Sequence, residues 1–167
     1  MFIQNTNPSM RNFNSDLELG HRAEEYVLEQ LKVLYPTMRR IEGKNVHYDL
    51  IDDNNFTIEV KFDLKSKETK RIGIEYMHRG LPSGISISKA NRWVLIYYLE
   101  DRWVWTMMDT DKLRKYIKQN RAIYRRYLGD RDKSSLLLID TSEISNHFGY
   151  YEIREKQSYN NIPDKNA

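Results

Sequence analysis

Residues 46–62, VHYDLIDDNNFTIEVKF, decide how this chain folds. Two short apolar-rich runs flank the polar turn Asp52–Asn55, which is the pattern of a β-hairpin. Successive strand residues face opposite sides, so Glu59 and Lys61 share one face of the second strand while the apolar residues beside them enter a core. Asp49, across the hairpin, brings a second carboxylate to the same place. Two hard oxygen ligands beside a lysine suit Mg²⁺ and a metal-activated water that attacks a phosphodiester.

The composition limits the classes of protein to which the chain can belong. With 167 residues, of which 40% are hydrophobic, it is expected to form one domain with a proper core. The absence of cysteine excludes disulfides, thiolate zinc sites and cysteine nucleophiles. No apolar run approaches the roughly 20 residues of a membrane span, and the N-terminus does not resemble a signal peptide. We therefore expect a cytoplasmic protein that has no contact with a membrane.

Positive charge is concentrated in one segment. The formal net charge is only +3, but the segment from Lys112 to Lys133 holds nine basic and two acidic residues. A local basic stripe is better evidence for a polyanionic partner than a modest total charge. DNA is the partner that we expect.

The chain is expected to divide into an arm, one folded domain and a tail. Residues 1–14 are polar and rich in asparagine, which predicts a loose arm, and residues 157–167 have the composition of a disordered tail. The domain comprises residues 15–156. At its start, a capping box predicts a helix over residues 15–34, which a Tyr-Pro pair then ends.

The rest of the domain is expected to alternate between strands and helices. The run from Trp93 to Leu99 is almost entirely apolar, which predicts a central strand. A basic, tyrosine-rich stretch predicts an amphipathic helix over residues 111–128. The further expected elements are a loop at 63–71, strands at 71–77 and 103–108, a loop at 79–84, a helical turn at 88–91 and edge strands at 136–140 and 150–154.

The order of these motifs resembles the PD-(D/E)XK nuclease superfamily, which includes type II restriction enzymes, archaeal Holliday-junction resolvases and recombination exonucleases. A helix with Gly20-x-x-x-Glu24 is followed by a strand with Asp49, a strand with Glu59-x-Lys61, a third strand, a short helix and a further strand. The resemblance covers residues 16–99. It is nearest to small phage and prophage nucleases and to resolvase-like members. One departure is that Tyr48 stands where the motif has a proline.

This resemblance implies a set of site residues. Asp49 and Glu59 would bind the metal, together with the carbonyl of Val60, and Lys61 would be the catalytic lysine. Glu24 would be the acid of the first helix, which binds a second metal or its water, and the four ionisable side chains together form the expected catalytic set. The implied cofactor is Mg²⁺, for which Mn²⁺ is expected to substitute.

The resemblance also implies a fold and an activity. The fold is α/β and restriction-endonuclease-like, with a mixed central β-sheet flanked by helices. The activity is hydrolysis of DNA phosphodiester bonds, by an endonuclease in preference to an exonuclease. Because nothing in the sequence suggests a base-specific element, cleavage is expected to depend on junctions, branches or ends. Resolvases cut two strands symmetrically as dimers, so a homodimer is a further expectation, with the hairpin 93–108 as its contact.

Residues outside the motif are expected to contact the DNA. Basic side chains suit phosphate contacts, and a loop serine can approach a phosphate. The expected nucleic-acid-binding residues are Lys65, Lys67, Ser83, Arg114, Lys118, Arg121 and Arg125.

Simpler interpretations remain open beside these. Glu59 and Lys61 could form an ordinary surface ion pair, and the basic helix could present only a solvated face. Glu75 could be an additional acid of the site or a partner for a nearby basic residue. For the whole protein, the alternatives are a catalytically silent nucleic-acid-binding module and a phage-type protein that binds a host protein.

Overall fold

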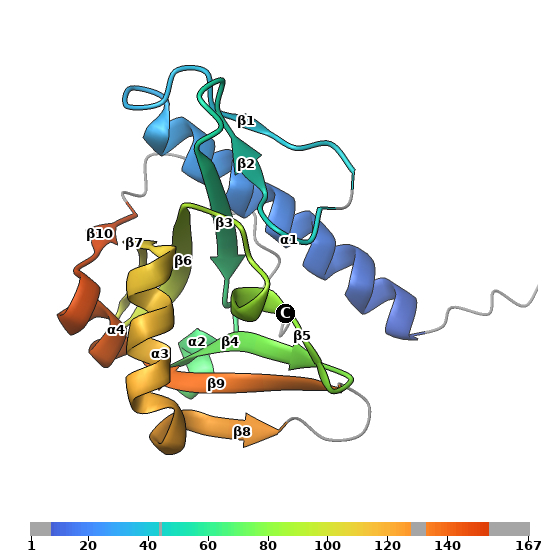
Figure 1. Ribbon diagram of the computed structural model, residues 1–167, viewed down its shortest axis with the longest axis vertical. Helices are drawn as coiled ribbons and strands as arrows, with labels where there is room; N and C mark the ends of the chain where they lie inside the picture. The colour runs from blue at the N-terminus through green and yellow to red at the C-terminus, as the bar shows by residue number, and fades with distance from the viewer. Residues whose placement is uncertain (1–7, 44, 128–132, 154–167) are drawn as a thin grey trace, which may run out of the picture.

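The protein has an α/β fold, described by a computed structural model over residues 8–43, 45–127 and 133–153, in which helices flank a mixed central sheet (Figure 1). Six strands form the central sheet in the order β1-β2-β3-β6-β7-β10. Strands β3 and β6 run parallel, whereas the other neighbours are antiparallel, so the sheet is mixed as predicted. The strands are β1 (Arg39–Arg40), β2 (Leu50–Ile51), β3 (Thr57–Phe62), β6 (Arg92–Leu99), β7 (Arg102–Asp109) and β10 (Tyr151–Glu152).

A second, four-stranded sheet crosses the end of the first. Its antiparallel order is β5-β4-β9-β8, and Figure 1 shows it below the end of β3. The strands are β4 (Arg71–His78), β5 (Leu81–Pro82), β8 (Arg125–Tyr127) and β9 (Ser134–Asp140). The helices are α1 (Pro8–Leu31), α2 (Ser66–Thr69), α3 (Thr110–Tyr124) and α4 (Thr141–Phe148), with one 3₁₀ turn, η1 (Gly84–Ser86).

The predicted hairpin is confirmed and joins β2 to β3. The carboxylate of Asp52 closes the turn, because its Oδ1 accepts hydrogen bonds from the backbone N–H groups of Asn54 at 2.9 Å and Phe56 at 2.7 Å. Asn55 occupies the left-handed region with φ of 61°, a conformation that asparagine tolerates better than most residues. The two strands and the Asx-type turn therefore form in the region for which the sequence predicted them.

Strand β3 is covered on both faces. Ile58 and Val60 pack against Ala23 and Val27 of α1, as the alternation predicted. The opposite face was expected to be open, but Glu59 is only 9% exposed. Its parallel partner in β6 is Trp93, a fully buried residue of the hydrophobic core that lies between the two sheets and α3. Burial of this face places the carboxylate at the border of a core rather than on a solvated surface.

Several predicted boundaries are wrong. Helix α1 begins at Pro8, so residues 8–14, assigned to the arm, are helical; proline is well suited to the first helical position. The loop at 63–71 contains the short helix α2. The helical turn expected at 88–91 occurs earlier, as η1. The parts of the predicted arm and tail at residues 1–7 and 157–167 lie outside the described residues.

The C-terminal third differs most from expectation. The helix predicted over 111–128 ends at Tyr124, because Arg125–Tyr127 pairs with β9 as strand β8. Strand β9, expected at an edge, is interior, between β4 and β8, whereas β10 is an edge strand as predicted. Helix α4 was not predicted. Within the described part of the chain, no helix is long and apolar enough to cross a membrane.

Replacing Gly84 with alanine will destabilise the protein by about 3 kcal/mol. Gly84 has φ of +51°, and a Cβ there would lie 2.3 Å from the carbonyl oxygen of Glu75 in β4. The control is Gly80→Ala, where φ is also positive but no atom lies within 4 Å of the added carbon, so only strain of about 1 kcal/mol is expected. Urea unfolding measures both, and equal losses would contradict the close approach of η1 to β4.

Candidate functional site

The hairpin brings Asp49 and Glu59 together. Leu50 pairs with Ile58, and the backbone N–H of Asp49 donates to the carbonyl of Ile58 at 2.9 Å, so the register continues to place Asp49 opposite Glu59. The Oδ2 atom of Asp49 then accepts a hydrogen bond from the backbone N–H of Val60 at 2.7 Å. The side chain of Asp49 is therefore fixed against the strand that carries Glu59.

Both of these carboxyl groups have a pKa above the ordinary value. Burial raises the pKa of Glu59 above its ordinary value, and the Asp49 carboxylate raises it further, while Lys61 acts in the opposite direction. Burial also raises the pKa of Asp49, although the hydrogen bond from Val60 opposes the shift. Burial and a nearby like charge both favour the neutral acid, which is the electrostatic condition of a site that can hold a cation.

Lys61 lies beside both acids and remains accessible. Its Nζ is 3.1 Å from Oε1 of Glu59, and its side chain is 47% exposed. Partial desolvation lowers the pKa of Lys61, but the attraction of Glu59 and Asp49 outweighs it and the net shift is upward. The ammonium group is therefore charged at neutral pH and close enough to solvent to meet an incoming anion.

Glu24 of α1 is the third acid of this group. Burial, followed by the charge of Asp49, raises the pKa of Glu24 to about 7. Arg40 of β1 opposes this shift, with its Nε 3.8 Å from Oε2 of Glu24. The side chain of Glu24 is 15% exposed and that of its neighbour Glu25 is 68% exposed, which agrees with the choice of Glu24 made from helical periodicity.

Two basic residues near these acids were not predicted as site residues. His21 lowers the pKa of Asp49, and it precedes Glu24 by three residues, a spacing that places both on one helical face. That spacing could have identified it. Arg40 comes from a two-residue strand, and no sequence motif marks it.

Asp49 and Glu59 leave oxygen atoms available to a ligand. Among the described residues, Oδ1 of Asp49 and Oε2 of Glu59 have no hydrogen-bond partner, and no three His, Cys, Asp or Glu side chains are grouped closely enough to hold a metal by themselves. Mg²⁺ is commonly held by one or two carboxylates, with water and substrate phosphate completing the shell. The donor set therefore fits Mg²⁺ better than a metal that needs an all-protein cage.

Glu75 of β4 is anchored close to this group. Ser83 and Ser134 each donate a hydroxyl hydrogen bond to Glu75, the second at 2.7 Å, and Nδ1 of His78 lies 2.8 Å from the hydroxyl of Ser134. The charge of Glu75 raises the pKa of Lys61, so the two side chains interact electrostatically. Two serines therefore donate hydrogen bonds to Glu75, in place of the nearby basic residues considered from the sequence. Ser83, which was expected to contact DNA, is one of these two serines.

The residues expected to contact DNA are scattered. Lys65 precedes α2 and Lys67 lies within it; both are exposed, four and six residues after Lys61, and Lys118 is exposed on α3. Arg114 is turned inward, because its Nε donates to the carbonyl of Ile85 at 3.2 Å and its Nη2 donates to the carbonyl of Ser88. It joins α3 to η1. The side chains of Arg121 and Arg125 lie outside the described part of the structure.

The chain was compared with models of protein families and with curated proteins. No family model matches the chain, and no curated protein matches its sequence.

The metal-free protein will lose stability as the pH rises from about 4.5 to about 8. Glu24 has an ordinary pKa of 4.5 and a folded-state pKa of about 7, so its contribution is full below pH 4.5 and is lost as the pH rises through 7. The loss is about 3 kcal/mol for this group, and the upward shifts of Asp49 and Glu59 act in the same direction. The contribution of Lys61 to stability is constant in this window, because its pKa is raised from the ordinary value of 10.5 and the group stays charged up to about pH 8.

Urea unfolding in EDTA across this pH range measures the effect. Glu24→Gln removes the largest share, so this variant will exceed the wild type in stability at about pH 8 and match it at about pH 4. Glu29→Gln, at an exposed position on the same helix, is the control and will follow the wild type. A Glu24→Gln curve parallel to that of the wild type would show that Glu24 titrates normally.

Proposed function

We propose that the protein is a Mg²⁺-dependent DNA nuclease with a restriction-endonuclease-like fold, related to the PD-(D/E)XK superfamily. The observation that carries the proposal is the convergence of Asp49 and Glu59 at one position of the hairpin, with Lys61 at 3.1 Å from Glu59 and Glu24 in electrostatic contact. These motif residues, which are separated in the sequence, lie in one cluster in the structure. A surface ion pair between Glu59 and Lys61 would not require the other two acids.

The arrangement of elements supports the same proposal. Helix α1 packs on the strand that carries the Glu-x-Lys motif, and that strand pairs in parallel with β6. This order of helix, hairpin and parallel strand around the acids is the one that the resemblance implies. Glu75 of the second sheet interacts electrostatically with Lys61.

The side chains suggest a division of labour. Asp49, Glu59 and the carbonyl of Val60 would hold the metal, and Glu24 would hold a second ion or its water. Bound Mg²⁺ would supply Lewis-acid polarisation of the scissile phosphate and a water of lowered pKa. The Lys61 ammonium would orient that water and offset negative charge as it develops on the phosphate. Asp49, fixed by Val60, keeps its carboxylate in place without a conformational change.

The remaining basic side chains would hold the DNA backbone. Lys65 and Lys67 are exposed and follow the strand of Lys61 in the sequence. When one DNA phosphate binds at Lys61, these two lysines would contact the adjacent phosphates. Contacts of this kind do not read base sequence, and they weaken steeply with salt. Cleavage selected by a junction, branch or end is therefore the proposed specificity, with endonucleolytic cutting favoured.

One observation favours a second candidate, a nucleic-acid-binding module without chemistry. Glu59 is already paired with Lys61, and the described residues contain no group of three metal-ligating side chains. A silent module would keep this pair as a structural ion pair and would bind DNA equally well with or without a divalent ion. Cleavage dependent on Mg²⁺ separates the two candidates.

Mg²⁺ will raise the melting temperature of the protein. At ten times its dissociation constant, the ion contributes about 1.4 kcal/mol, or about 4 °C for a chain of this size. The shift will be smaller at about pH 5, where Glu24 keeps its proton. Differential scanning calorimetry measures it, and the Asp49→Asn/Glu59→Gln double variant, whose side chains keep their shape, will lose it. A double variant that responds to Mg²⁺ as strongly as the wild type would place the ion elsewhere.

The wild type will cut DNA in Mg²⁺ or Mn²⁺ and will be inactive in EDTA. Lys61→Ala will reduce the single-turnover rate by about 100-fold or more, because it removes a charge aimed at the transition state. The assay uses single-stranded, duplex, flapped and four-way DNA, and branched substrates are expected to be cut fastest.

Lys32→Ala serves as the matched control, because Lys32 is exposed at the end of α1. If Lys61→Ala cuts as fast as this control, Lys61 has no catalytic role. If neither protein cuts any substrate, the nuclease proposal fails and the binding module remains.

A further inference from the structure

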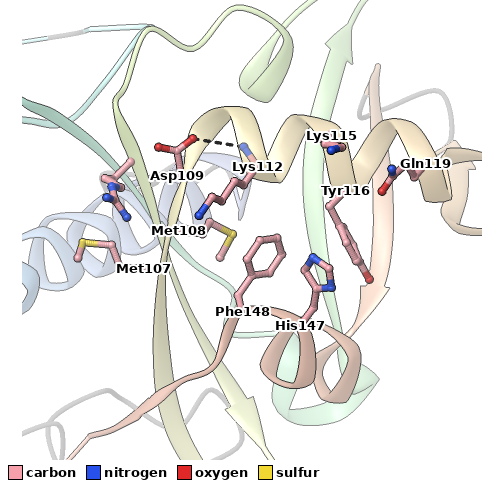
Figure 2. A pocket seen from close by; sticks show the side chains of 10 residues that line it. Met107, Met108, Asp109, Lys112, Lys115, Tyr116, Gln119, His147 and Phe148 are labelled. Carbon is pink, nitrogen blue, oxygen red and sulfur yellow. Dashed lines mark hydrogen bonds between the residues drawn. The ribbon is translucent and has the colours of Figure 1, made fainter.

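A pocket of about 450 Å³ lies away from the Asp49–Glu59 cluster. It is bounded by the end of β7, the first turns of α3 and the end of α4 (Figure 2). Pockets of about 300 to 1,000 Å³ are the size that holds a small molecule. None of the acids of the candidate metal site lines it, so its chemistry is independent of the proposed nuclease activity.

One part of the pocket is cationic. Lys112 and Lys115 of α3 line it together with Arg92 of β6, and within the described part of the chain none of the three has a carboxylate within ion-pair distance. The one acid in the lining is Asp109, whose Oδ1 accepts hydrogen bonds from the backbone N–H groups of Asp111 at 3.1 Å and Lys112 at 3.3 Å. That carboxylate is committed to the start of α3, so the lining keeps an excess of positive charge.

The other part is aromatic and apolar. The ring of His147 lies 4.7 Å from that of Tyr116 and 4.5 Å from that of Phe148, measured between centroids. Figure 2 shows His147 and Phe148 on α4 facing the helix that carries Lys112, with Met108 beside them. Tyr116 and Met108 are themselves buried, so the exposed ring of His147 and the half-buried ring of Phe148 provide the surface for a flat, apolar group.

We propose that this pocket binds a nucleotide, with its phosphate at Lys112, Lys115 and Arg92 and its base against the aromatic part. A phosphate would form charge-assisted hydrogen bonds with these three cations, and a planar base would stack on the rings, which accept any base. The amide of Gln119, which also lines the pocket, offers both a donor and an acceptor to a base edge. The ligand is either a free mononucleotide or a nucleotide of a single strand, since both present the same chemistry.

Isothermal titration calorimetry on the full chain in EDTA tests this, with deoxyadenosine 5′-monophosphate, inorganic phosphate and a short single-stranded oligo(dA) as probes. The Lys112→Gln/Lys115→Gln variant will bind nucleotide about tenfold more weakly or worse, because two charge-assisted contacts are lost. The control, Lys32→Gln/Lys89→Gln, removes the same charge from exposed positions outside the pocket and will stay within about twofold of the wild type.

Each outcome decides the proposal. Binding of the mononucleotide that weakens only in the pocket variant supports it and identifies a free nucleotide as a source. The same pattern with the oligonucleotide alone supports it and identifies a strand. Equal weakening in both variants shows non-specific attraction and overturns it, as does phosphate that binds as tightly as the mononucleotide. Absence of binding by both nucleotide probes also overturns it.

Discussion

The close approach of two carboxylates in a place with little water is the constraint on which the site depends. Asp49 is held by the backbone of Val60, and Glu59 is only 9% exposed, at the border of the core between the two sheets and α3. A turn into solvent would break the hydrogen bond of Asp49 to Val60 or the ion pair of Glu59 with Lys61. Burial raises both pKa values, and the charge of Asp49 raises that of Glu59 further, so nearby positive charge would stabilise the ionised pair. The chain supplies part of it through Lys61, and a divalent ion would supply the rest.

The fold builds this constraint from strand β3. One face of the strand packs on α1, which also delivers Glu24, and the other face carries Glu59, beside Trp93 of the neighbouring strand β6, toward the core between the two sheets. Glu75 comes from β4 of the crossing sheet. A strand covered on both faces cannot shift by one residue without exchanging its apolar and charged sets. The same packing that stabilises the domain therefore sets the position of every acid. The pocket between α3 and α4 is lined by residues of other elements, so the two proposed ligand sites are separate in the structure.

Local patterns in the sequence predicted the hairpin that carries the candidate site and the longer strands of the central sheet. The hairpin, the strand at Trp93–Leu99 and the choice of Glu24 all follow from spacing within a few residues. The errors lie where distant segments decide. Arg125–Tyr127 pairs with β9 and so leaves the predicted helix. Arg114 donates to the backbone carbonyls of Ile85 in η1 and of Ser88 after it, 29 and 26 residues earlier. Ser134 donates a hydrogen bond to Glu75, 59 residues earlier in the sequence, and no sequence motif predicts this contact.

Anomalous diffraction from crystals grown with Mn²⁺ tests the central claim most directly, because it locates the ion without relying on activity. The account predicts a Mn²⁺ peak within coordination distance of one oxygen each of Asp49 and Glu59, with Glu24 facing the same peak. It also predicts that Lys61 moves off Glu59 while Asp49 stays bonded to the N–H of Val60. An ion bound elsewhere, with the Glu59–Lys61 pair unchanged at saturating Mn²⁺, would contradict it.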